Sequence, residues 1–157
     1  VLGDGKLGLL VAQILALTGC CLTVIGRYPE KLAIPAARGI STQLGSEGLA
    51  GYADLVVECT GRAEGYQEAR ELVRPRGTLV LKSTHHGLVQ TDLSNLAVDE
   101  IRIVGSRCGP FAPALRLLAQ GLVDVRPLID AEYPLSQALA AFEHAARPGA
   151  LRVLVRP

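Results

Sequence analysis

Short apolar runs alternate with longer helical patterns through the first two thirds of the chain. The apolar runs are rich in Val, Ile or Leu, and Gly or Pro bounds them. The expected strands cover residues 1–2, 22–25, 40–43, 54–59, 78–82 and 101–104. The expected helices cover residues 6–18, 29–38, 64–73 and 112–120. This alternation predicts βαβ units and an α/β fold: a doubly wound, six-stranded parallel sheet with the strand order 3-2-1-4-5-6.

The pattern changes after Pro127. A strand-like run at 128–133, a helix at 136–146 and a last strand at 151–155 predict a C-terminal tail of residues 128–157 behind a main domain of residues 1–127. At the other end, a glycine turn begins two residues after Val1, whereas a buried strand normally supplies about 5 residues before such a turn. Together with the absence of Met, this leads us to expect a segment of a longer polypeptide.

Composition narrows the possible functions. The chain has 157 residues, of which 49% are hydrophobic and 20% charged, and its formal net charge is +1. A near-neutral balance and 4% aromatic residues argue against nucleic-acid binding. The four cysteines have no metal-ligand spacing, which favours a reducing, cytoplasmic location. No apolar run reaches the ~18 residues of a membrane span, so we expect no membrane partner.

The main motif is a glycine-rich turn between the first expected strand and helix. It reads Gly3, Asp4, Gly5, Lys6, Leu7 and Gly8, the spacing GxGxxG. In the Rossmann fold the first glycine permits the turn, the second lets the backbone approach a pyrophosphate, and the third lets helix and strand pack closely. The anion then meets the positive end of the helix dipole. The motif in this position predicts a dinucleotide site.

The end of the second expected strand bears on which dinucleotide is bound. An NAD-type site has an Asp or Glu there for the ribose hydroxyls, but this chain has Gly26 followed by Arg27. An acid would repel a 2′-phosphate, whereas Gly26 is expected to leave room and Arg27 to contact the phosphate. We therefore expect NADP to be preferred, with NAD as the alternative.

Together with the turn, three segments resemble the cofactor domain of the zinc-dependent alcohol dehydrogenase family, the medium-chain dehydrogenases/reductases. They read Pro-Glu-Lys-Leu at 29–32, Val-Glu-Cys-Thr-Gly at 57–61 and Arg-Gly-Thr-Leu-Val at 76–80. The resemblance implies a preceding catalytic domain, absent here, that carries the zinc and the proton relay, and to which residues 128–157 return. It also implies an alcohol or carbonyl substrate and a homodimer that pairs through residues 101–104.

The resemblance assigns cofactor roles residue by residue. The turn from Asp4 to Gly8 would cradle the pyrophosphate, and Lys31 would contact the adenosine ribose, five positions after Gly26. Further residues would line the ribose, nicotinamide and carboxamide sites: Cys59, Thr60, Lys82, Ser83, Val104 and Ser106. The departure at Gly26 removes the carboxylate of an NAD-type site.

None of the other reactive side chains has the spacing expected of a catalytic or metal-binding site. His85 and His86 follow the fifth expected strand, where ligands bind, but lack a Cys or Glu at ligand spacing. Glu58 and Asp54 do not form an acid/base pair, because Asp54 begins its strand. We therefore expect the chain to bind cofactor without catalysing alone. Two alternatives remain: a non-catalytic dinucleotide-binding or redox-sensing module, and a methyltransferase, which Gly26 disfavours.

Overall fold

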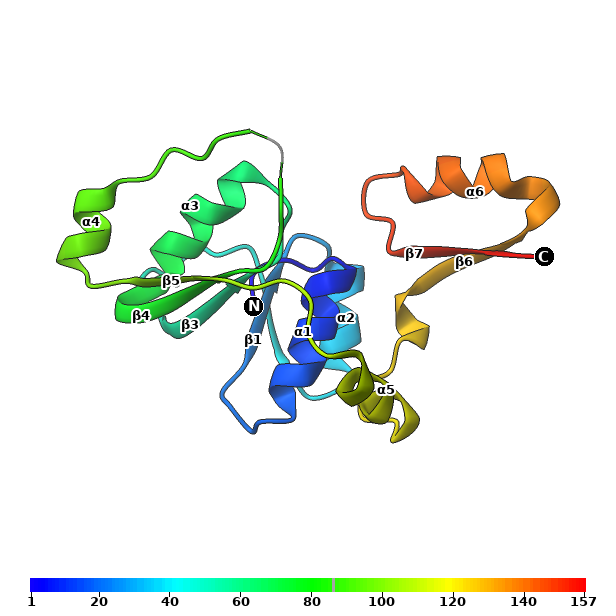
Figure 1. The fold of residues 1–157 in the computed structure, drawn as a ribbon, viewed down its shortest axis with the longest axis horizontal. Helices are drawn as coiled ribbons and strands as arrows, with labels where there is room; N and C mark the ends of the chain where they lie inside the picture. Colours follow the sequence, from blue (N-terminus) through cyan, green and yellow to red (C-terminus); the bar gives the residue numbers. More distant parts are fainter. Residues whose placement is uncertain (86) are drawn as a thin grey trace. The chain divides into compact units, whose positions relative to one another are not determined.

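The computed structural model describes residues 1–85 and 87–157, which form two compact units. Unit 1 covers Val1–Pro110 and unit 2 covers Phe111–Pro157 (Figure 1). The expected division at residue 127, between a cofactor domain and a tail, concerns function and stays a prediction.

Unit 1 is built on parallel strands. They are β1 (Thr23–Gly26), β2 (Ser41–Leu44), β3 (Ala53–Glu58), β4 (Val73–Leu81) and β5 (Arg102–Gly105). β1 pairs with β2, and β4 pairs with both β3 and β5, all in parallel. Leu2 forms parallel bridges to Ile25 of β1 and to Glu58 of β3, and so stands where the first strand was expected. The spatial order β2-β1-Leu2-β3-β4-β5 confirms the predicted 3-2-1-4-5-6 order of a Rossmann fold.

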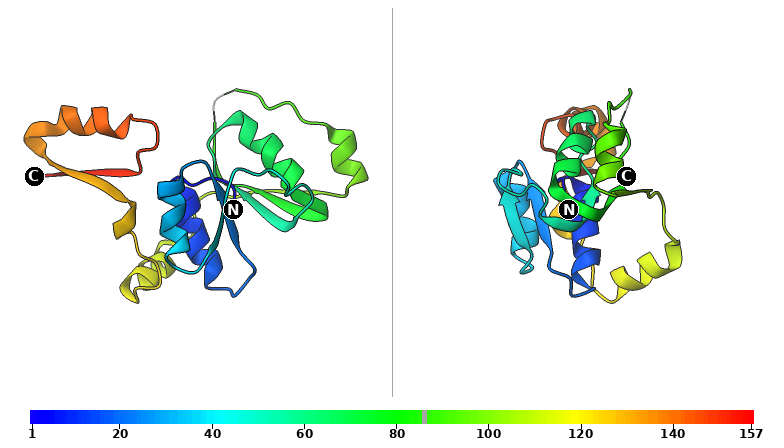
Figure 2. Two further views of the ribbon diagram at one scale, coloured as in Figure 1. Left: turned by 180° about the vertical axis from the view of Figure 1, so that it is seen from behind. Right: turned by 90° about the vertical axis from the view of Figure 1, so that its left-hand side faces the viewer.

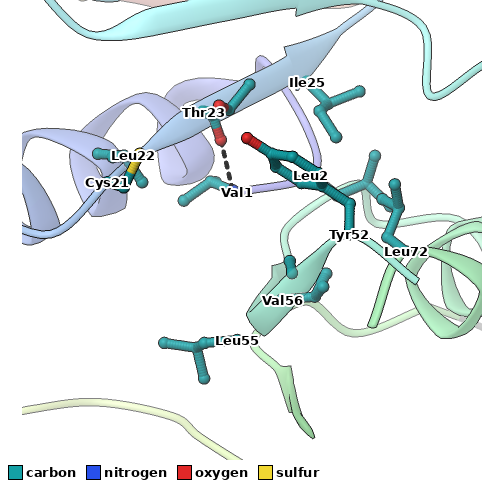
Figure 3. A pocket seen from close by; sticks show the side chains of 11 residues that line it. Val1, Leu2, Cys21, Leu22, Thr23, Ile25, Tyr52, Leu55, Val56 and Leu72 are labelled. Atoms are coloured by element: carbon teal, nitrogen blue, oxygen red, sulfur yellow. Dashed lines mark hydrogen bonds between the residues drawn. The ribbon is translucent and has the colours of Figure 1, made fainter. Parts of the chain in front are cut away.

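Leu2 is the residue that this chain contributes at the central strand position. Figure 3 shows Leu2 beside Ile25 and Val56, with the amino group of Val1 donating to the carbonyl of Thr23 over 2.8 Å. A cavity of about 70 Å³ next to Val1 is lined mainly by apolar side chains.

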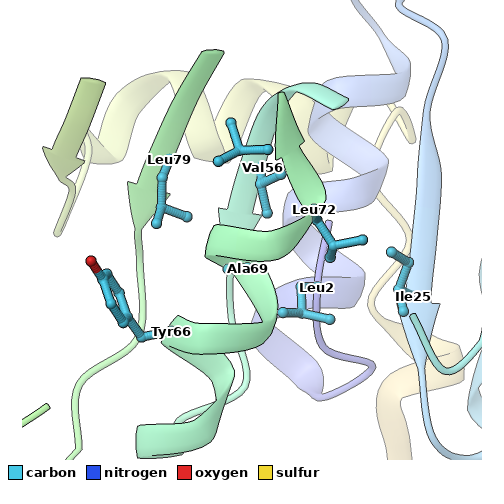
Figure 4. Packing of buried hydrophobic residues seen from close by; sticks show 8 residues of the cluster. Leu2, Ile25, Val56, Tyr66, Ala69, Leu72 and Leu79 are labelled. Atoms are coloured by element: carbon cyan, nitrogen blue, oxygen red, sulfur yellow. The ribbon is translucent and has the colours of Figure 1, made fainter. Parts of the chain in front are cut away.

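Helices cover both faces of the sheet. In unit 1 they are α1 (Lys6–Ala16), α2 (Pro29–Ala36), α3 (Ala63–Leu72) and α4 (Leu93–Val98). Successive strand residues point to opposite faces. Accordingly, Val24 packs in a cluster with Ala12 of α1 and Leu32 of α2, whereas Ile25 belongs to a cluster that contains Ala69 of α3 (Figure 4). The sheet therefore has helices α1 and α2 on one face and α3 on the other.

Two elements of unit 1 differ from expectation. β4 begins at Val73 rather than Thr78, because a large irregularity in its pairing with β3 lies between these residues and accommodates Arg76 at φ 63°. The pattern also missed α4, whose first turn is capped by Asp92: its carboxylate accepts from the N–H groups of Ser94 and Asn95.

Unit 2 contains a strand–helix–strand motif, as the sequence predicted. Its elements are α5 (Phe111–Ala119), two short 3-10 helices (Arg126–Leu128 and Leu135–Gln137), β6 (Ile129–Pro134), α6 (Ala138–Ala145) and β7 (Arg152–Arg156). β6 and β7 pair in parallel, and α6 connects them (Figure 2). The Asp130 carboxylate accepts from the N–H of Leu151 over 2.5 Å, which fixes the start of β7.

Candidate functional site

The three glycines of the turn have different surroundings. Gly3 has φ +115°, and a Cβ there would lie 2.9 Å from the carbonyl of Cys59. A Cβ at Gly8 would lie 1.9 Å from the carbonyl oxygen of Gly3. At Gly5, by contrast, a Cβ would meet no described atom within 4 Å. The first and third glycines thus permit backbone packing, and the second borders open space that a ligand can enter.

Helix α1 begins directly at this open space. Gly5 is its N-cap residue and has no side chain to cap it, and the first intrahelical bond runs from the N–H of Leu9 to the carbonyl of Gly5 over 2.9 Å. The helix also has no acidic residue in its first turn. The N-terminal N–H groups and the helix dipole therefore favour an anion at this end.

The space beside Gly26, which we expected to be open, is filled by Asp4. A Cβ at Gly26 would lie 2.5–2.7 Å from side-chain atoms of Asp4. The N–H groups of Arg27 and Tyr28 both donate to Oδ2 of Asp4, over 2.7 and 2.8 Å. Asp4 is 7% exposed. A carboxylate thus lies at the end of β1 after all, but the glycine turn supplies it.

Two cations lie beside Tyr28, the residue that precedes α2. Nζ of Lys31 is 4.1 Å from the centre of the Tyr28 ring, and Cζ of Arg27 is 5.9 Å from it. Lys31 is buried and Arg27 is exposed. The structure therefore brings together Gly26, Arg27 and Lys31 at the end of β1, as the sequence predicted. It adds Asp4 and Tyr28, which the sequence reasoning did not place there.

A buried carboxylate organises the carboxyl ends of β3 and β4. Oε1 of Glu58 accepts from the N–H and the hydroxyl of Thr60, over 2.6 and 2.5 Å, and Oε2 accepts from the hydroxyl of Ser83. The Ser83 hydroxyl accepts in turn from the N–H of Gly61 over 3.0 Å. Two of the residues assigned to the nicotinamide side, Thr60 and Ser83, are thus held by Glu58, whose role the sequence reasoning missed. A Glu ending an otherwise apolar run was the available signal.

Cys59 and Lys82 complete this edge of the sheet. Burial, together with the neighbouring carboxylate of Glu58, raises the pKa of Cys59 to about 12, so its thiol stays neutral and unreactive near neutral pH. Nζ of Lys82 donates to the backbone carbonyls of Ser106, over 3.5 Å, and of Arg107. Lys82 and Ser106 are therefore neighbours, and Val104 pairs with Val80 two strand positions earlier.

Comparison with known proteins identifies the family. Residues 7–120 match the zinc-binding dehydrogenase family. A provisionally named D-xylulose reductase of Rhizobium meliloti is 33% identical over 99% of this chain and 49% of its own length. The chain belongs to the zinc-binding dehydrogenase family. The resemblance drawn from the sequence is thereby confirmed.

Other relatives agree with this. A sorbitol dehydrogenase of Halalkalibacterium halodurans is 31% identical over 100% of this chain and 51% of its own length. A provisionally named zinc-binding dehydrogenase of Sinorhizobium meliloti 1021, solved with NADP bound, superposes with a TM-score of 0.87 at 26% identity, over 99% of this chain and 51% of that one. The chain thus spans about half the length of the relatives that it matches.

The part of the chain that the structure describes has no site for the family's zinc. Within residues 1–85 and 87–157, no three His, Cys, Asp or Glu side chains gather as a metal site would require. His85 lines a cavity of about 390 Å³ with Glu58, Arg62 and Ser83, and His86 lies outside the described residues. The residues present therefore do not fit a zinc ion.

Three further observations concern other parts of the chain. Asp54, at the start of β3, is exposed and pairs with Arg74 over 2.6 Å, away from the carboxyl ends of the strands. In unit 2 the hydroxyl of Tyr133 lies 3.0 Å from Nδ1 of His144. The described helices include none with the length and apolar character of a membrane span.

Proposed function

We propose that the chain is the dinucleotide-binding part of an NAD(P)-dependent alcohol or polyol dehydrogenase. The observation that carries the proposal is the open space at Gly5, between two glycines that are each packed against backbone, at the start of α1. A pyrophosphate fits there because the turn has no side chain in its way and the helix dipole attracts it. The NADP-bound relative supports this assignment.

Under this proposal the cofactor residues divide along the sheet. Arg27 and Lys31 bind the adenosine ribose end, and the turn from Gly3 to Gly8 binds the pyrophosphate. At the ends of β3, β4 and β5, six residues orient the nicotinamide: Cys59, Thr60, Lys82, Ser83, Val104 and Ser106. When bound, the dinucleotide supplies hydride transfer, and these residues fix its position.

The proposed domain roles and substrate class rest on similarity to the relatives. Residues 1–127 form the cofactor domain, and residues 128–157 pack against a catalytic domain that supplies the zinc and the substrate pocket. The sorbitol dehydrogenase and D-xylulose reductase names of relatives favour a polyol or its carbonyl partner as substrate. All four cysteines are free and three are exposed, which supports a reducing, cytoplasmic location. A non-catalytic sensor remains the second candidate, and a zinc-dependent turnover by the full-length protein would exclude it.

Cofactor preference is the sharpest test of the proposal. We propose NADP(H) over NAD(H), because Arg27 and Lys31 place two cations beside the end of β1. Arg27→Ala should weaken NADPH binding about tenfold to a hundredfold, which is about 1.5–3 kcal/mol for a charge-assisted contact, and leave NADH binding nearly unchanged. Fluorescence titration at fixed salt measures both, with Arg147→Ala of unit 2 as the matched control. Equal loss of both cofactors, or no loss, would contradict the assignment.

A further inference from the structure

The side chain of Asp4 and the missing side chain of Gly26 are complementary. The three nearest atoms to a Cβ on Gly26 all belong to the Asp4 side chain, at 2.5–2.7 Å. No larger residue fits at position 26 while Asp4 keeps its place, and the carboxylate occupies the volume that a side chain there would fill. The two positions thus act as one unit, although they lie 22 positions apart in the sequence.

Asp4 also satisfies backbone groups that would otherwise attract an anion. The N–H groups of Arg27 and Tyr28 lie where β1 ends and α2 begins, and both donate to Oδ2 of Asp4. Tyr28, the N-cap residue of α2, makes no side-chain capping bond of its own. A phosphate at this point would meet N–H groups already bonded to a carboxylate, and must rely on the side chains of Arg27 and Lys31.

We propose that Asp4 is a specificity-determining residue for the adenosine ribose. Its carboxylate opposes a 2′-phosphate, and so reduces the preference for NADP(H) that Arg27 and Lys31 create and keeps NAD(H) a usable ligand. This rests on the proposed dinucleotide site. An NAD-type site carries a negative charge at the strand end that corresponds to Gly26, the end of β1. In this chain Asp4 of the glycine turn supplies that charge.

The test separates charge from shape. Asp4→Asn keeps an oxygen that can accept from both N–H groups but removes the negative charge. Affinity is measured for 2′,5′-ADP and 5′-AMP, which differ only in the 2′-phosphate. We expect the ratio of the two affinities to shift about tenfold toward 2′,5′-ADP, since a like charge nearby has been removed. Asp54→Asn, the same substitution at an exposed site at the start of β3, should leave the ratio unchanged.

A second variant moves the carboxylate instead of removing it. The double variant Asp4→Gly with Gly26→Asp clears the space beside position 26 and places the acid on the strand end itself. We expect the affinity ratio to shift toward 5′-AMP, below that of the wild type. An unchanged or opposite shift in either folded variant overturns the role of Asp4. If the wild-type chain binds neither nucleotide, the proposed dinucleotide site itself has failed, which is a different result.

Discussion

Alanine at each of two glycines separates a packing role from a ligand-binding role. In Gly8→Ala the new Cβ would lie 1.9 Å from the Gly3 carbonyl oxygen, about 1.1 Å inside the closest approach of 3.0 Å that real Cβ atoms show. Both partners belong to the backbone, so the turn or α1 must move by about 1 Å. In Gly5→Ala the new Cβ would meet no described atom within 4 Å.

The two substitutions should therefore lower the free energy of unfolding by different amounts. Overpacking at Gly8 costs about 3–4 kcal/mol, and the higher helix propensity of Ala returns about 1 kcal/mol, so we expect a net loss of about 2–3 kcal/mol. For a chain of this size that lowers Tm by about 4–12 °C. At Gly5, Ala replaces an N-cap glycine at an ordinary backbone angle of φ −75°, which costs at most about 1 kcal/mol.

Thermal unfolding and NADPH titration should therefore respond differently. Gly8→Ala should lose both stability and binding. Gly5→Ala should keep its Tm within about 3 °C and lose at least about tenfold in NADPH affinity, since its methyl group occupies the proposed pyrophosphate space. Gly109→Ala, where a Cβ also has open space, is the control for both measurements. Wild-type affinity in Gly5→Ala would refute the pyrophosphate assignment, and wild-type stability in Gly8→Ala would refute the packing argument.

Two further predictions concern the thiols and the sheet edge. Iodoacetamide at pH 7.5 should label the exposed cysteines but not Cys59, and labelling of Cys59 in the folded chain would contradict its raised pKa. Because that pKa rises from 9.0 to about 12 on folding, the unfolding free energy should fall by about 1.4 kcal/mol per pH unit between these values, a slope that Cys59→Ala lacks. β5 lies at the edge of the described sheet with Ile103 39% exposed, so we expect a homodimer through this strand. Ile103→Lys should dissociate it in light scattering, and a wild-type monomer at all concentrations would refute the dimer.

Local pattern predicted most of the fold. The strand order followed from the alternation of strands and helices, and the turn and the start of α1 followed from the glycine spacing. Short or irregular elements were harder to predict. Helix α4 has six residues, too few to show a helical period. The first residues of β4 were not recognised as strand because its pairing with β3 is irregular and Pro75 and Gly77 interrupt the apolar pattern.

Side-chain contacts between residues far apart in the sequence limited how much of the site could be predicted. The sequence placed Arg27 and Lys31 near the end of β1, but it gave no sign that Asp4 would reach across 23 residues to the N–H of Arg27. The bond from the Ser83 hydroxyl to Glu58 spans 25 residues. Such contacts depend on how strands and turns lie side by side in space, and a single sequence carries no periodic signal for them.

We propose that the glycine turn of this chain holds the pyrophosphate of a dinucleotide. An NMR titration of the ¹⁵N-labelled chain with NADP⁺ tests it most directly, because each backbone N–H reports on its own surroundings. We expect saturable shifts at the turn from Gly3 to Gly8, at Arg27 and Tyr28, and at the ends of β3 and β4. Saturable shifts confined to other residues, or none at millimolar NADP⁺, would contradict it.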